Sequence, residues 1–191
     1  QQVNYVGRVT QTGVGTNERE QRSWIMYGKR KLYCGRTVKN SNGGAIRLGS
    51  ISHVPSSLGD ILIGEIDTNL GVKWAKLITA FGASDSKHTT QTKNMDYING
   101  SLYLSGMMKG GFAPYGEEEA RIASKSTPLN RFVIKCDASN GEWLGGVSAD
   151  EQGIGGYFGV AKGKENNLSA YGNSWATPNK GICLHTKEEY S

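Results

Sequence analysis

The sequence repeats itself at an interval of about 70 residues, and this repetition constrains the fold more than any other feature. The segment 61–67 reads ILIGEID and matches 131–137, which reads RFVIKCD, 70 positions later. The segment 32–35 (LYCG) matches 102–106 (LYLSG) at the same offset, and a third copy follows in which 168–172 reads LSAYG. A fixed period of this kind is typical of a chain that stacks one supersecondary unit several times.

Inside each copy the pattern is that of strands and turns. Short runs rich in Val, Ile, Tyr, Trp and Leu alternate with clusters of Gly, Asn, Asp and Ser, and helical spacing of apolar residues is nearly missing. The sequence therefore predicts an all-β chain with four strands per repeat. The expected strands are 23–27, 31–36, 61–67 and 72–79 in the first copy, 94–98, 101–106, 131–137 and 141–148 in the second, and 157–161, 167–172 and 181–187 in the third.

Two kinds of turn support this assignment. Asn99-Gly100 is the preferred dipeptide of a type I′ hairpin, because both central residues need a positive φ. Asp67 and Asp137 each precede a glycine by four positions, and aspartate suits such a turn because its carboxylate accepts nearby backbone N–H groups. We therefore interpret the two aspartates as turn residues rather than as calcium ligands.

The third copy stops after its third strand, and its fourth strand is expected at the other end of the chain. Residues 3–9 align with the segments that begin at Trp74 and Trp143, at an offset of 69 in both cases. We predict that residues 3–9 pair with 181–187 and so close the array. The same alignment predicts equivalent environments for the two tryptophans.

Four antiparallel strands repeated radially form the blades of a β-propeller, in which each blade buries its faces against its neighbours. We therefore expect one all-β domain over 1–191, made of three four-stranded propeller-type blades with the N-terminal strand completing the last blade. The repeats span about 11–71, 72–140 and 141–191 plus strand 3–9. Because propellers usually have four to eight blades, we expect either two chains joined as 3 + 3 or a segment of a longer propeller. The alternative is a β-sandwich built from three hairpin pairs.

A family resemblance rests on the run I-x-x-I-D-x-N-x-G-x-x-W, which ends at Trp74 and is followed by L-Y-x-x-G at 102–106. This run resembles the bacterial β-propeller repeat, often called the SBBP repeat, of large surface and secreted proteins. The resemblance covers 61–106 well and 131–172 in part, whereas the third copy lacks the aspartate of its third strand. It implies a propeller that binds or scaffolds, and it carries no catalytic residue.

The sequence offers no catalytic motif. A hydrolytic triad needs a nucleophile, a base and an orienting acid within hydrogen-bond reach, yet no serine lies in a G-x-S-x-G elbow. We interpret two of the three histidines, His53 and His88, as loop residues and His185 as a packed strand residue. We therefore expect no enzymatic activity.

Metal, cofactor, nucleic-acid and membrane sites are not expected either. The sequence holds no zinc motif, no twelve-residue calcium loop and no P-loop, so we expect no metal and no cofactor. The formal charge is 22 − 17 = +5, but the only basic run is Lys29-Arg30-Lys31, which is too short for a phosphate-binding stripe. No apolar run approaches the roughly 18 residues of a membrane helix.

The candidate binding residues lie in the loops between the second and third strands, which leave the same end of every repeat. These loops, at 36–60, 107–130 and 173–180, differ in content over a constant frame, as binding loops do. Aromatic rings beside carboxylates, amides and arginine suit sugars, because rings stack on C–H faces while polar groups bond hydroxyls. The alternative is that the aromatics pack their own loops. The candidate residues are Phe112, Tyr115, Glu118, Arg121, Asn173 and Trp175.

Two function classes follow. The first is a non-catalytic extracellular binding module, carbohydrate-binding (lectin-like) or adhesin-like, presented on propeller loops. The alternative is a structural or assembly subunit of a larger surface or secreted complex, since unpaired edge strands invite another copy or a partner chain.

An extracellular or cell-surface location is expected because Gln1-Gln2 would suit a mature start after signal removal. N-x-S sequons occur at Asn99 and Asn167, and the three cysteines allow one disulfide whose pairing stays open among Cys34, Cys136 and Cys183.

Overall fold

The computed structural model describes the chain in segments. The described residues are 3–5, 23–28, 31–38, 45–48, 50–55, 59–67, 69, 71–82, 91–108, 110–123, 130–148, 155–162, 168–174, 180–183 and 189–190. Every regular element in these segments is a β-strand, so the all-β class is confirmed. None of these residues forms a helix with the length and apolarity needed to cross a membrane.

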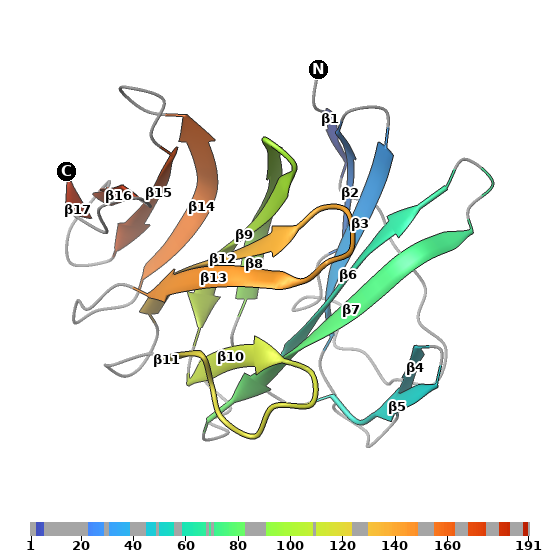
Figure 1. Cartoon of the computed structure of the whole chain (residues 1–191). Helices are drawn as coiled ribbons and strands as arrows, with labels where there is room; N and C mark the ends of the chain where they lie inside the picture. Colours follow the sequence, from blue (N-terminus) through green and yellow to red (C-terminus); the bar gives the residue numbers. More distant parts are fainter. Residues whose placement is uncertain are drawn as a thin grey trace.

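The strands form three curled antiparallel sheets and one small hairpin (Figure 1). The first sheet has the order β1-β2-β3-β6-β7-β10-β11, and the small hairpin pairs β4 with β5. The strands of this group are β1 (Val3–Tyr5), β2 (Ser23–Gly28), β3 (Lys31–Val38), β4 (Ile46–Leu48), β5 (Ile51–His53), β6 (Asp60–Ile66), β7 (Val72–Phe81), β10 (Gly111–Pro114) and β11 (Ile122–Ala123).

The second and third sheets have four strands each. The second has the order β13-β12-β9-β8, and the third has the order β14-β15-β16-β17. Their strands are β8 (Gln91–Ile98), β9 (Ser101–Met108), β12 (Asn130–Asp137), β13 (Trp143–Ser148), β14 (Gly155–Lys162), β15 (Leu168–Ser174), β16 (Lys180–Cys183) and β17 (Glu189–Tyr190).

The predicted four-strand repeat is present in each main sheet. The runs β2-β3-β6-β7, β8-β9-β12-β13 and β14-β15-β16-β17 each pass in chain order through neighbouring antiparallel strands. A bulge recurs at the same place in two of them, between Glu65 and Ile66 and between Lys135 and Cys136, 70 residues later. The period in the sequence therefore corresponds to a period in backbone structure, down to the irregularity of the ladder.

The β8–β9 hairpin has the turn that its sequence predicts. Ile98 and Ser101 are paired, and the two residues between them, Asn99 and Gly100, have φ angles of 50° and 80°. Two successive positive φ angles define the type I′ geometry, whose twist matches that of the flanking strands.

The two turn aspartates also have the role expected of them. Oδ1 of Asp67 accepts the N–H groups of Asn69 and Gly71 at 2.9 and 2.7 Å. Oδ1 of Asp137 accepts the hydroxyl and the N–H of Ser139 at 2.7 and 2.8 Å, and these bonds hold the pKa of Asp137 below its usual value. Across the described segments, no three His, Cys, Asp or Glu side chains are grouped as a metal site would require.

The expected closure between the chain ends is wrong. β1 pairs with β2, with Tyr5 opposite Ile25, and not with 181–187. β16 lies between β15 and β17, so the chain's own residues 189–190 provide the fourth strand of the third sheet. Both observed pairings join segments that are near in sequence, and the entropy cost of closing such short loops is lower. Residues 6–9 and 184–187 lie outside the described residues.

The expected equivalence of the two tryptophans is also wrong. Trp74 lies opposite Glu65, whereas Trp143 lies opposite Cys136. In the repeat, Cys136 corresponds to the residue after Glu65, so Val72 is the counterpart of Trp143. The register of a ladder is set by its turn and its bulge, and a matching side chain two positions away does not change it.

The three sheets stack, and the middle sheet is buried on both faces. Its first face joins the inner face of the first sheet in the main core, whose largest members are Tyr33, Ile61, Ile63, Met95, Leu102, Leu104, Met108, Phe112, Phe132 and Ile134. Its second face carries Tyr103 and Val133, and Leu168 of the third sheet packs against them. Alternation along the strands therefore produces two apolar faces instead of one apolar and one polar face.

The segment that carries β10 and β11 ties the first two sheets together. It belongs to the second repeat by sequence, yet β10 pairs with β7 of the first sheet, with Phe112 opposite Ala80. β11 then reaches back to the second sheet, where the hydroxyl of Ser148 donates to the carbonyl of Ala123 at 3.0 Å.

Gly141 gives a direct test of how the first sheet docks on the second. Its φ is 77°, and a Cβ at this position would lie 2.3 Å from Cζ3 of Trp74. We expect Gly141→Ala to lower the free energy of unfolding by about 3 kcal/mol, because a strained backbone and an overpacked contact add. The control is Gly100→Ala, with φ 80° and open space around it, which should cost about 1 kcal/mol. Urea unfolding measures both, and equal costs would contradict the docking contact.

Candidate ligand-binding surface

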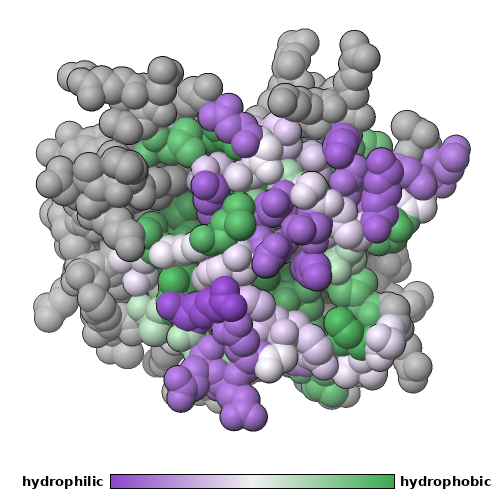
Figure 2. Space-filling model, in the orientation of Figure 1, coloured by the Kyte–Doolittle hydropathy of each residue, from purple (hydrophilic) through white to green (hydrophobic). Residues whose placement is uncertain are grey.

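The described candidate residues gather on the turn between β10 and β11. Backbone hydrogen bonds fix both ends of this turn: the N–H of Tyr115 donates to the carbonyl of Leu77 at 2.9 Å, and the N–H of Arg121 donates to the carbonyl of Phe112 at 2.8 Å. Hydrophilic side chains cover this part of the molecule, at the lower centre of the view (Figure 2). We call Tyr115, Glu117, Glu118, Arg121 and Trp143 the β10–β11 surface.

Arg121 is the organising side chain of this surface. Glu117 receives both arms of its guanidinium, with Nε 2.9 Å from Oε2 and Nη2 bonded to Oε1. These bonds raise the pKa of Arg121 further above its already high value. Its Cζ lies 5.9 Å from the ring centroid of Trp143, within the range of a cation–π contact. A bidentate carboxylate and an aromatic face therefore hold the guanidinium in one orientation, although 45% of the side chain is exposed.

Tyr115 stands at the other side of the turn. It is 41% exposed, and its ring meets the ring of His53 edge-on, with centroids 5.4 Å apart. Nε2 of His53 lies 2.7 Å from Oδ2 of the fully buried Asp60, whose Oδ1 accepts the N–H of Ala80 at 2.7 Å. His53 is therefore a positioned residue that supports Tyr115, whereas the sequence interpretation placed it in a solvated loop.

The remaining candidates are not all together. Glu118 is exposed on the same turn, but Phe112 is a core residue with no exposed surface, and its ring packs on Phe132 at 4.9 Å. Phe112 therefore fits the alternative in which an aromatic packs its own loop. The backbone of Asn173 lies in β15 opposite Gly156, while its side chain and the whole of Trp175 lie outside the described residues. His88 and His185 lie outside them as well.

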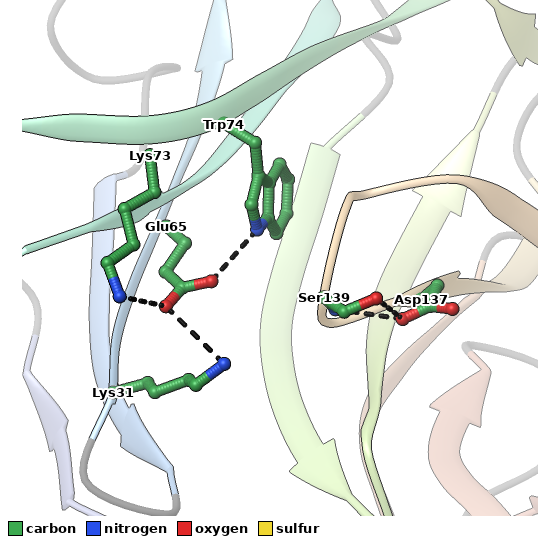
Figure 3. Close-up of polar contacts among 6 residues, drawn as sticks. All are labelled: Lys31, Glu65, Lys73, Trp74, Asp137 and Ser139. Atoms are coloured by element: carbon green, nitrogen blue, oxygen red, sulfur yellow. Dashed lines mark hydrogen bonds and ion pairs between the residues drawn. The ribbon is translucent and has the colours of Figure 1, made fainter.

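A second polar group, the Glu65 cluster, lies on the face of the first sheet that packs on the second (Figure 3). Glu65 is 3% exposed, and its Oε2 accepts the indole N–H of Trp74 at 3.0 Å. Its Oε1 pairs with Nζ of Lys73 at 3.3 Å and with Nζ of Lys31 at 3.7 Å. The buried carboxylate is thus compensated by two cations and one hydrogen bond, and it holds the indole against Gly141.

The Glu65 cluster borders a tyrosine pair that links the first two sheets. The rings of Tyr33 and Tyr97 stack at 5.4 Å with an interplanar angle of 17°. Burial raises the pKa of Tyr33 to about 12, and the negative charge of Glu65 adds to the effect. Glu65 could have been found in the sequence, because it shares its strand face with Ile61 and Ile63, where a charge needs partners.

The cysteines offer no reactive site among the described residues. Cys34 and Cys136 are both free thiols. Burial raises the pKa of Cys34, and it raises that of the fully buried Cys136 to about 12. A thiol with so high a pKa carries almost no thiolate at neutral pH, so neither group is poised as a nucleophile.

Comparison with known proteins gives no relative for this surface. No family model matches the chain, no curated protein sequence matches it, and no solved structure matches it. The chemistry of the surface therefore has to be inferred from its own geometry.

Removal of Glu65 should loosen the contact between the first two sheets. We expect Glu65→Ala to cost about 3 kcal/mol in unfolding free energy, since it leaves two ammonium groups and an indole N–H without their acceptor. Tryptophan fluorescence should shift to longer wavelength as Trp74 loses its anchor. Glu142→Ala, at an exposed position, is the control and should cost less than about 0.5 kcal/mol. A loss equal to that of the control would show that the cluster does not stabilise the fold.

The raised pKa of Tyr33 predicts a loss of stability in alkali. An unfolded tyrosine ionises near pH 10, whereas folded Tyr33 stays neutral until about pH 12. Its contribution is therefore complete below about pH 10 and is lost as the pH rises toward 12, by about 1 kcal/mol at pH 11. Tyr33→Phe should remove this part of the pH dependence of urea unfolding, while Tyr115→Phe, at an exposed ring, should leave it unchanged.

Proposed function

We propose that this protein is a non-catalytic binding module and that the β10–β11 surface binds carbohydrate. The observation that carries the proposal is the fixed, exposed guanidinium of Arg121, held by Glu117 beside the ring of Trp143. The exposed ring of Tyr115 lies on the same turn. The surface is thus pre-formed, so little side-chain entropy would be lost on binding.

The chemistry of the surface suits a sugar. Guanidinium N–H groups donate to hydroxyl oxygens, and the carboxylates of Glu117 and Glu118 accept hydroxyl protons. The flat rings of Tyr115 and Trp143 present apolar faces to the C–H bonds of a pyranose. Neutral sugars need this combination of stacking and hydrogen bonding, because they offer no charge for long-range attraction.

The setting proposed for this module is a β-propeller-type array on a bacterial surface or in a secreted protein. Three four-stranded meanders that stack one on the next support this arrangement, and the resemblance to the bacterial propeller repeat favours an extracellular location. The two-sided burial of the middle sheet speaks for stacked blades and against a two-layer sandwich, in which each sheet has one solvated face.

The proposal is tested by screening the whole chain on a glycan array and measuring the strongest ligand by calorimetry. We expect Arg121→Ala and Trp143→Ala to weaken binding at least about tenfold, and Arg121→Lys to weaken it nearly as much, since lysine cannot reproduce the bidentate geometry. Leu144→Ala is the matched control, because this neighbour of Trp143 is 49% exposed and belongs to no polar contact described above.

Circular dichroism should show that each variant keeps its strand content. Absence of any retained glycan, or equal binding by Arg121→Ala and the parent protein, would contradict the carbohydrate proposal.

A further inference from the structure

The face of the first sheet that points away from the second sheet carries a row of apolar side chains. Leu32, Ile66 and Val72 lie directly opposite one another on β3, β6 and β7. Side chains of paired residues share a face, so the three form one cross-strand row. Leu32 and Ile66 are half-buried, and Val72 is 68% exposed, the most exposed large apolar residue in the described segments.

The counterpart of this row in the second sheet is buried. Leu102 pairs with Cys136, and Cys136 pairs with Trp143, in the same places relative to the bulge. Leu102 and Cys136 have no exposed surface, and Trp143 packs against the same core, which the first sheet supplies from the other side. An identical position in the repeat is therefore covered in one sheet and partly open in the other.

The neighbouring row shows the same contrast. In the first sheet it consists of Cys34, Gly64 and Ala75, of which the cysteine and the alanine are half-buried. In the second sheet the corresponding positions on β9 and β12 are Leu104 and Ile134, and both are fully buried. We call the two rows of the first sheet, with residues 32, 34, 64, 66, 72 and 75, the open face.

Inside the chain, every sheet contact has the same direction. The face with Tyr33 and Ile63 covers the face with Leu102 and Ile134 of the next sheet, and the face with Tyr103 and Val133 covers the third sheet at Leu168. Tyr103 and Val133 stand 70 residues after Tyr33 and Ile63, so one face of each sheet always covers the opposite face of the next. The open face lacks a preceding sheet of this kind, and the third sheet lacks a following one.

We propose that the open face is an interface and that its occupant is the outer face of the third sheet of a second copy of this chain. The contact would repeat the geometry already present twice within the chain. Head-to-tail contacts either close into a ring or continue as a filament, and two copies with three sheets each make six, within the range in which such arrays close. Each copy would give one face and receive one, so a two-fold pair would leave no open face. This proposal does not depend on the binding of carbohydrate.

The oligomeric state of the full chain gives the first test. We expect sedimentation equilibrium at micromolar concentration to show a pair of 20.7 kDa chains. Val72→Glu should raise the dissociation constant at least about tenfold, because it places a charge in the apolar row while its exposed position spares the fold. Leu144→Glu is the matched control, since its side chain is 49% exposed and lies outside the open face, and it should leave the pair intact.

The partner's contact surface is tested by cross-linking. A photoreactive benzophenone side chain at position 72, in a mixture of light and heavy isotope-labelled chains, should yield links between copies that map to 155–190. Alkylation of Cys34, followed by peptide mass mapping, should slow as the protein concentration rises into the range of pairing. A monomer at all concentrations, or links between copies that map only to the first sheet, would overturn the proposal.

Discussion

The docking of Trp74 on Gly141 is the contact on which the arrangement of the first two sheets depends. The indole occupies the space where any other residue at 141 would place its Cβ, and the left-handed backbone of that turn already favours glycine. Glu65 fixes the indole from below through a hydrogen bond, and Lys31 and Lys73 compensate the buried charge. A polar cluster in one sheet thus determines how closely an apolar turn of the next sheet can approach.

Stacking of the sheets follows from a pattern that ordinary antiparallel sheets lack. Both faces of the middle sheet are apolar, so neither can be left in water, and each has a neighbouring sheet. The segment of β10 and β11 adds to this arrangement, because it leaves the second sheet, extends the edge of the first and returns. Its β10–β11 turn is therefore fixed at both ends, which explains how exposed side chains on it hold a defined geometry.

The candidate site depends on contacts between segments that are far apart in sequence. Trp143 lies on a different sheet from the turn that carries Arg121, and His53 and Asp60 belong to the first repeat although they support Tyr115 of the second. The resulting surface has its rigid members below and its exposed polar groups above, so the interactions that stabilise the fold also orient the groups proposed to bind.

The sequence by itself determined the all-β class, the strands of each repeat and the turns at Asn99-Gly100, Asp67 and Asp137, because these depend on local backbone preferences and a 70-residue period. Only the tertiary structure decided that β1 pairs with β2, that Val72 matches Trp143, and that Phe112 is core while Tyr115 is exposed. These features depend on which distant segments meet and on where a bulge shifts the register. Local sequence carries little information about either, since the free energy of such contacts belongs to both partners at once.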